Sequence, residues 1–194
     1  MRTGGDAFAI RLADARAGDP AAWLALYDLV APVVRAYLHA QSLPDPDDVA
    51  GETLLQVVRD LHRFDGTERQ FVSWTLAIAH HRMIDARRSL QRRPASPYPN
   101  DALPDEHAPD ETAAAVLADA EWTDVASVLA VLTDEQREVV GLRVVGGMTL
   151  EETAAALGRT VGSVKALQHR AFRALREHVA STRNPEATVD AHRV

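Results

Sequence analysis

The 194-residue chain contains no cysteine, few aromatic residues (5%) and no long apolar run. Without cysteine there are no disulfides, no thiolate zinc ligands and no cysteine nucleophile. No stretch approaches the roughly 20 apolar residues that cross a bilayer, and the first ten residues lack the pattern of a secretory signal. We therefore expect a cytoplasmic protein without a membrane span. This length suits one mid-sized domain or two small ones.

Charge is unevenly distributed along the chain, although its formal net charge is −7. Residues 81–93 contain five Arg and one Asp, and residues 159–178 contain five basic residues and one Glu. Between these blocks, residues 94–135 contain ten acidic residues and no Lys or Arg. Because local clusters set the field that an anion meets, two basic blocks favour a polyanion as partner. A solvated helix face is the alternative for either block alone.

Strand signals are weak, since Ala and Leu dominate and β-branched alternation is absent, so the sequence predicts an all-α fold. The spacing of apolar residues predicts helices over about 20–39, 47–62 and 70–90. Asp19 is expected to cap the first of these helices. Pro32 is expected to kink it or split it in two.

A proline-rich stretch separates two helical halves. Residues 94–110 contain five prolines, and such a run is interpreted as a flexible, acidic linker. Beyond it we expect an Ala-rich helix over 111–132 and a compact three-helix pattern to about residue 179. The predicted organisation is an N-terminal extension (1–19), a helical domain (20–93), the linker (94–110), a second helical domain (111–180) and a frayed tail (181–194).

The C-terminal half has the pattern of a helix-turn-helix. Thr133 with Gln136, and Thr149 with Glu152, are arranged as capping boxes, and Gly158 suits a left-handed helix end. A short turn containing Gly joins two helices in this motif. One side of the last helix is apolar, and the other carries Ser163, Lys165, His169, Arg170 and Arg173. This design suits a helix that lies in a DNA groove; a helical hairpin with a solvated basic face is the alternative.

The helix expected over 70–90 combines aromatic residues with arginines. Phe71 and Trp74 stand near its start, and Phe64 lies in the preceding loop. Aromatic rings beside arginines suit single-stranded DNA, because stacking is worth roughly 1–3 kcal/mol per base and the cations neutralise phosphates. A place in the core is the alternative for each ring. Asp85 is expected to share the apolar face and to pair with Arg88.

Several segments follow one another in the order and spacing of a known family. They are Asp45–Thr53, Arg63–Gly66, Phe71–Trp74 and Ala79–Arg88 in the first half, and Leu132–Glu138, Gly147–Ala154, Leu157–Lys165 and His169–Ala171 in the second. In these segments the chain resembles bacterial RNA polymerase sigma factors of the extracytoplasmic-function (ECF) class, which keep only the second and fourth conserved sigma regions. The resemblance covers about 20–93 and 111–179. Gly51 and His81 depart from it, where the family usually has Gln and Asn.

The resemblance implies a sigma region 2-like bundle and a region 4-like helix-turn-helix. Such a protein binds core RNA polymerase, recognises the −35 and −10 promoter elements and promotes DNA melting. Contacts with the clamp helices of the largest polymerase subunit are implied for Asp47, Asp48, Glu52 and Gln56. Contacts with the −10 element and its melting are implied for Arg63, Phe64, Asp65, Gly66, Phe71, Trp74, Arg82, Arg87 and Arg88. Contacts with the −35 element are implied for Arg159, Thr160, Ser163, Lys165, His169, Arg170 and Arg173, with Lys165 and Arg170 favoured for base edges.

The resemblance also implies a contact with the flap of the second-largest polymerase subunit and an anti-sigma factor, through which the protein would be held at the membrane. For the acidic linker, mimicry of nucleic acid and a plain spacer remain open. We expect no cofactor, metal or enzymatic activity: P-loop, GxGxxG and GxSxG motifs are missing, and the pair His80–His81 does not form a zinc motif. The rival interpretations are a plain DNA-binding regulator, which would bind duplex operator DNA strongly by itself, and an enzyme.

Overall fold

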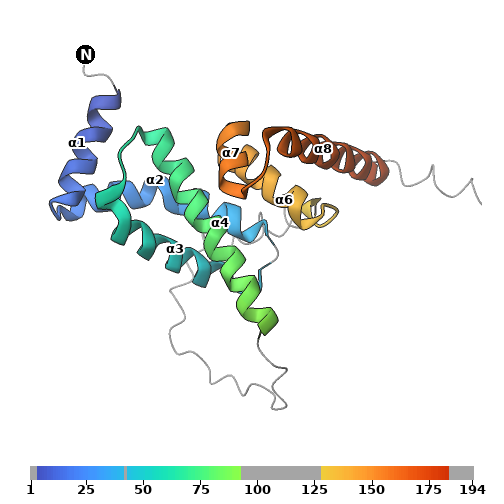
Figure 1. The fold of residues 1–194 in the computed structure, drawn as a ribbon, viewed down its shortest axis with the longest axis horizontal. Coiled ribbons are helices and arrows are strands. Elements are labelled where there is room, and N and C mark those ends of the chain that lie inside the picture. Colours follow the sequence, from blue (N-terminus) through green and yellow to red (C-terminus); the bar gives the residue numbers. More distant parts are fainter. Residues whose placement is uncertain (1–3, 42, 93–127, 184–194) are drawn as a thin grey trace, which may run out of the picture.

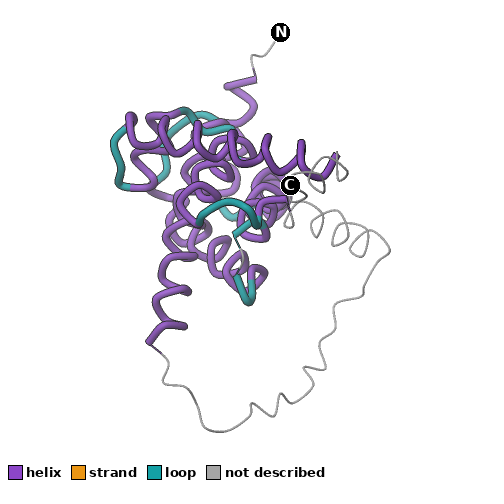
Figure 2. Tube along the Cα trace, turned by 90° about the vertical axis from the view of Figure 1, so that its right-hand side faces the viewer, coloured by secondary structure: helices purple, strands orange, loops and turns teal. Residues whose placement is uncertain are grey.

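The computed structural model describes residues 4–41, 43–92 and 128–183, which are helical and contain no strand (Figures 1 and 2). The elements are α1 (Gly4–Arg16), α2 (Pro20–His39), α3 (Pro46–Asp60), a 3₁₀ turn (Leu61–Arg63), α4 (Glu68–Arg92), α6 (Asp134–Val140), a π-helical turn (Gly141–Val145), α7 (Leu150–Leu157) and α8 (Val161–Arg183). The all-α prediction is confirmed. The linker, most of the helix expected over 111–132 and most of the expected tail lie outside the described residues.

Helix α2 is the central helix of the N-terminal bundle, the name used here for residues 4–92, and it packs against α1, α3 and α4. Asp19 caps it as predicted, accepting from the N–H of Ala21 at 3.0 Å. Pro32 does not split it, because the helix continues to His39. Burial of the neighbouring Val30, Ala31 and Val34 offsets the backbone hydrogen bond that proline cannot make.

By length and composition alone, α2 is long and apolar enough to cross a membrane. The expectation that no segment reaches this limit was therefore wrong. The apolar character of α2 has a structural explanation, since its buried residues, among them Leu26, Val34 and Leu38, form part of the bundle core.

The N-terminal extension contains a helix, α1, that packs on the bundle. Phe8, Leu12 and Ala15 are buried in one hydrophobic cluster with residues of α2 and α4. At the end of α1, Nε of Arg16 donates to the carbonyl of Leu61 at 3.2 Å, and its guanidinium also donates to the carbonyl of Phe64. Helix α1 therefore supports the loop that precedes α4.

The spacing of Trp74, Ala77, Ile78 and Ile84 predicts the apolar face of α4, but the structure buries a different face of this helix. Leu76, Ala79 and Met83 are fully buried, whereas Ile84 is half-buried. Asp85 pairs with Arg88 at 3.8 Å as expected, but it is exposed and does not share the apolar face. On α3, the spacing predicts an apolar side made of Val49, Leu54, Val57, Val58 and Leu61. Val58 does not belong to it, because it is 51% exposed.

The C-terminal bundle, residues 128–183, has the helix-turn-helix geometry that the caps predict. The N–H of Gln136 donates to Thr133 Oγ1 at 3.4 Å, and the N–H of Glu152 donates to Thr149 Oγ1 at 3.1 Å. In both boxes the return bond to the threonine N–H is present. Gly158 ends α7 with a φ of 60°, the left-handed conformation that suits glycine. The apolar side of α8 is buried at Val164, Leu167 and Ala171.

The two bundles pack against each other, and one hydrophobic cluster runs through both (Figure 1). From the N-terminal bundle it includes Tyr37, Leu76 and Met83, and from the C-terminal bundle Leu142 and Met148. The sequence predicted two independent domains, so this shared core is a finding of the structure.

Candidate nucleic-acid interface

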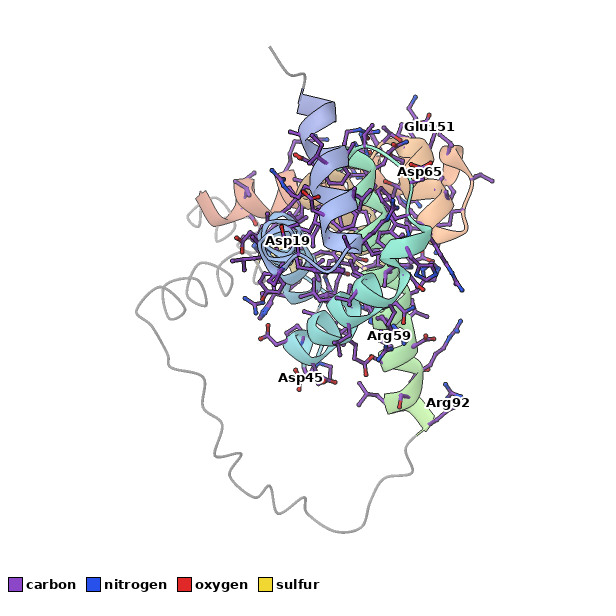
Figure 3. The ribbon with its side chains drawn as sticks, turned by 90° about the vertical axis from the view of Figure 1, so that its left-hand side faces the viewer. Asp19, Asp45, Arg59, Asp65, Arg92 and Glu151 are labelled. Carbon is purple, nitrogen blue, oxygen red and sulfur yellow. The ribbon has the colours of Figure 1, made fainter. Side chains whose placement is uncertain are left out.

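A cavity of about 610 Å³ lies between the loop before α4 and helix α7. The N-terminal bundle contributes to its lining Arg63, Phe64, Asp65, Gln70, Trp74 and His81, and the C-terminal bundle Met148, Glu152 and Ala155. Figure 3 shows Asp65 and Glu151, the neighbour of Glu152, at the same end of the molecule. The segment that the resemblance assigns to the −10 element therefore faces a hollow.

The aromatic residues near the cavity have different exposures. The ring centroids of Phe64 lie 5.2 Å from Phe71 and 5.1 Å from Trp74, and Phe8 of α1 lies 5.8 Å from Phe71. Phe71 is fully buried and Phe64 is 7% exposed, so both belong to the core. Trp74 is half-buried and lines the cavity, which makes it the most accessible of the three rings for stacking.

The loop before α4 is held by its own contacts. Gln70 Oε1 accepts from the N–H of Thr67 at 2.8 Å, which closes the first turn of α4. A Cβ on Gly66 would lie 2.9 Å from Phe64 Cζ and 2.9 Å from Gln70 Oε1, so glycine allows the loop to approach the ring. Arg63 is exposed and lies 3.8 Å from Asp60. The structure thus places Arg63, at the end of the 3₁₀ turn, and Asp65, in the loop that follows, in the lining of the cavity.

The three arginines of α4 that are predicted to bind DNA, Arg82, Arg87 and Arg88, have different contacts in the structure. Arg82 donates to Gln56 Oε1 at 2.5 Å, which links α4 to α3. Arg87 donates to Glu138 Oε1 at 2.9 Å, across the contact between the bundles. Arg88 is exposed. In this conformation Arg88 is therefore the most accessible of the three.

Helix α8 presents its predicted basic face to solvent. Lys165, His169, Arg170 and Arg173 are exposed, and Thr160 caps the helix by accepting from the N–H of Ser163 at 3.2 Å. Arg159 pairs with Glu135 at 2.5 Å. The apolar side of α8 therefore packs within the C-terminal bundle, and its basic side is exposed to solvent.

The residues predicted to meet the polymerase lie along α3. Asp47 is exposed and lies 3.4 Å from His39, and Asp48 and Glu52 are exposed and line a second cavity, of about 580 Å³. Gln56 is turned toward the bundle and donates to Asp60 Oδ2 at 2.5 Å. Among the described residues, no group of three or more His, Asp or Glu side chains is arranged to hold a metal ion.

Sequence reasoning missed a buried polar group at the contact between the bundles. The hydroxyl of Tyr37 shares a hydrogen bond of 3.1 Å with Nδ1 of His80. Burial, and then the charge of Glu138, raise the pKa of Tyr37. Burial also raises the pKa of Glu138, while its ion pair with Arg87 opposes that rise. Nothing local in the sequence marks these residues, because they meet only in the folded chain.

His80 gives the stability of the chain a pH dependence. Burial, and then the charges of His81 and Arg87, lower the pKa of His80 from 6.5 to about 4. Below pH 6.5 the unfolded chain therefore binds a proton that the folded chain excludes, so stability is present above that pH and is lost as the pH falls toward 4. Between pH 7 and pH 4 we expect His80 to contribute a loss of about 3 kcal/mol.

The measurement is urea unfolding of the wild type and of His80→Gln at pH 7, 5 and 4. All carboxylates, including Glu138, are present in both proteins, so their effects largely cancel in the comparison. The variant should lose less stability on acidification than the wild type. Parallel pH profiles for the two proteins would contradict the assignment.

Arg16 is expected to stabilise the loop before α4 through its bonds to two carbonyls. Arg16→Ala should reduce the free energy of unfolding by about 1–2 kcal/mol, since those carbonyls lose a charged donor. Arg11→Ala is the matched control, because Arg11 forms an exposed pair with Glu68 at 3.9 Å, and such pairs contribute little. Urea unfolding compares them; equal losses would show that the carbonyl contacts do not matter.

Comparison with known families assigns the two bundles to the sigma-70 type of transcription initiation factor, which is not a class of enzyme. The Sigma-70 region 2 model matches residues 22–93 and the Sigma-70, region 4 model matches residues 128–177. The chain is 34% identical over 176 residues to the ECF RNA polymerase sigma factor SigD of Mycobacterium tuberculosis, covering 88% of this chain and 82% of that one. It is 38% identical over 134 residues to the ECF RNA polymerase sigma factor ShbA of Streptomyces griseus, covering 67% and 69%. The chain belongs to the ECF RNA polymerase sigma factors.

Solved structures share this fold. The structure of CnrH in complex with the cytosolic domain of CnrY matches with a TM-score of 0.59 and 28% identity, over 89% of this chain and 96% of that one. The sigma factor RpoE of Bartonella quintana, in complex with the anti-sigma factor NepR, matches with a TM-score of 0.58 and 20% identity, over 79% and 94%. These matches agree with the arrangement of helices described above.

Proposed function

We propose that this ECF sigma factor divides promoter recognition between its two bundles. The segment 63–70, which comprises the loop before α4 and the first residues of α4, receives an unpaired base of the −10 element, with Trp74 behind it. Arg88 binds the adjoining backbone. Extruding a base costs a few kcal/mol, so a cavity that holds the base favours the open duplex. Phe64 and Phe71 form the floor under Trp74, a supporting role for these two predicted site residues.

In the same proposal, α8 reads the −35 element in the major groove. Lys165 and Arg170 contact base edges, and the remaining predicted residues on this face contact phosphates or position the helix. The observation that carries the proposal is the presence of two candidate DNA surfaces: the cavity beside the loop before α4, which the half-buried indole of Trp74 lines, and the exposed basic side of α8.

Polymerase contact is assigned to the acidic flank of α3. Asp47, Asp48 and Glu52 are exposed there, and Asp45, which Figure 3 labels, caps the start of the same helix. An acidic flank suits a basic surface on the clamp helices of the largest polymerase subunit. Gln56 contributes by holding Asp60 and Arg82 rather than by direct contact. The flap of the second-largest subunit would meet the C-terminal bundle.

Regulation by an anti-sigma factor is part of the proposal. It is supported by the likeness to CnrH, whose structure was solved in complex with the cytosolic domain of CnrY. We propose a cytoplasmic protein without enzymatic activity, held at the membrane only through such a partner. We propose domain limits of 20–93 and 111–180, with α1, from the predicted extension 1–19, packed on the first domain.

The test is run-off transcription with purified core polymerase and a library of randomised promoters. The chain should direct initiation at a defined start point and select two elements about 25 base pairs apart. A plain DNA-binding regulator would instead bind duplex DNA tightly by itself and give no new start point. That outcome would overturn the proposed function.

A further inference from the structure

His81 lines the cavity on its α4 side, at a position where the family usually has asparagine. The residues predicted for the −10 element did not include it. Its ring is exposed, and Nδ1 lies 2.7 Å from the carbonyl oxygen of Ala77, one turn earlier on the same helix. A carbonyl oxygen accepts and cannot donate, so this hydrogen bond places a proton on Nδ1.

The contact with Ala77 decides what the other ring nitrogen can do. A neutral imidazole carries one proton, so with Nδ1 protonated Nε2 is an acceptor. No described residue forms a hydrogen bond with Nε2. Asparagine would offer a donor and an acceptor at the end of its side chain. His81 instead gives the wall of the cavity an acceptor alone.

Along α4, His81 lies between two residues that the proposed function assigns to the −10 strand. Trp74, His81 and Arg88 are seven residues apart, and seven residues make almost two whole turns, so the three share one side of the helix. Trp74 is half-buried, and the other two are exposed. Ala77 also lines the cavity, and its small side chain leaves room between the indole and the imidazole.

The spacing between the indole and the imidazole suits a second nucleotide of the same strand. Seven residues of helix rise about 10 Å. This rise equals about three steps of a stacked strand at about 3.4 Å each, and fewer steps of an unstacked one. A base beyond the one on Trp74 can therefore meet His81 while its backbone continues toward Arg88.

An acceptor without a donor beside it separates the four bases into two classes. Adenine and cytosine carry an exocyclic amino group, which donates, whereas guanine and thymine carry a carbonyl oxygen at the corresponding place, which accepts. A keto base facing Nε2 would set two acceptors against each other and leave both without a partner.

We propose that His81 reads a second base of the −10 strand and selects one that carries an exocyclic amino group, adenine or cytosine. This inference rests on the proposed function and names the class of base that the same cavity takes beside the base on Trp74. Loss of His81 changes which promoters are used and leaves the fold and the binding of polymerase as they are.

The test is run-off transcription with core polymerase on promoters randomised over the −10 element, at pH 8, which favours the neutral form of a histidine ring. At one position, distinct from the one that Trp74→Ala affects, the wild type should prefer amino bases by about fivefold, as one hydrogen bond allows. His81→Phe keeps a ring without an acceptor and should lose this preference, while the −35 preference stays unchanged. His81→Asn should weaken it, because an amide also offers a donor to keto bases.

His62→Phe is the matched control. His62 is also exposed, and its Nδ1 lies 2.9 Å from the carbonyl oxygen of Arg59, but it does not line the cavity. The base preferences of this variant should equal those of the wild type at every position of the −10 element.

A base analogue isolates the single contact. Purine lacks the amino group of adenine, and pyrimidin-2-one lacks that of cytosine, so either analogue removes the donor and keeps the ring. Placed at the selected position, the analogue should reduce initiation by the wild type about fivefold, which is the effect of one hydrogen bond. It should change initiation by His81→Phe hardly at all.

The possible outcomes separate the two proposals. If the wild type initiates without a preference for amino bases at such a position, or if His81→Phe keeps that preference, the reading by His81 is overturned. If His81→Phe does not initiate, His81→Asn decides with the same analogue, and an undiminished loss would also overturn it. If the wild type itself does not initiate with core polymerase, the proposed function fails and this inference fails with it. A preference that disappears with the imidazole, together with insensitivity to the analogue, supports both.

Discussion

Lys165→Ala combined with Arg170→Ala is expected to reduce transcription from a selected promoter by at least about 30-fold. Both side chains are exposed on α8, whose opposite side is buried in its own bundle. A good contact to a base edge contributes about 1–3 kcal/mol of discrimination, so two contacts contribute about 2 kcal/mol or more. Run-off transcription on duplex templates measures the loss.

The same helix offers a matched control in Arg176→Ala. Arg176 is also exposed, but it lies about 16 Å beyond Lys165 along the helix axis. Its loss should cost much less, and mainly through the general attraction to phosphate. On a template whose −35 element is scrambled, the double variant and the wild type should become similar. A double variant that keeps its preference for the selected −35 sequence would contradict the assignment of α8.

The sequence was informative where structure is set locally. Asp19, Thr133, Thr149 and Gly158 mark helix ends, and each has the predicted capping geometry. A cap depends on groups within three or four residues, so its signal survives without knowledge of the tertiary fold. The exposed basic face of α8 was predictable for the same reason: its apolar side repeats at helical spacing.

The sequence was uninformative where segments far apart meet. Gln41 Nε2 donates to the carbonyl of Arg137 at 3.4 Å across 96 positions, and Arg87 reaches Glu138 across 51. Because α4 packs against helices of its own bundle and against α7, its buried residues do not form one simple stripe. The run of arginines on α4 predicts a DNA-binding surface, but one of them, Arg87, instead forms an ion pair with Glu138 of the other bundle. Helix α1 was missed because it has hardly any separation of apolar and polar faces.

Trp74→Ala is expected to reduce transcription from duplex templates by about tenfold or more, with little effect on templates that carry a pre-melted bubble. The indole lines the cavity and rests on Phe64, with ring centroids 5.1 Å apart. Stacking of one base on an aromatic side chain is worth about 1–3 kcal/mol. A pre-melted template does not require the protein to compensate for unpairing, so the difference between the templates isolates strand opening.

Trp23→Ala separates this role from simple loss of packing. Trp23 is half-buried and packs against the same hydrophobic cluster as Trp74, but it lies on α2 and does not line the cavity. Both variants should lose thermal stability, since each removes a large ring from the same cluster. Trp74→Ala alone should show the selective defect on duplex DNA, and Trp74→Phe, which keeps an aromatic face, should recover part of it. Equal defects on duplex and bubble templates would assign Trp74 to the core, and the surface that opens the promoter would have to lie elsewhere on the bundle.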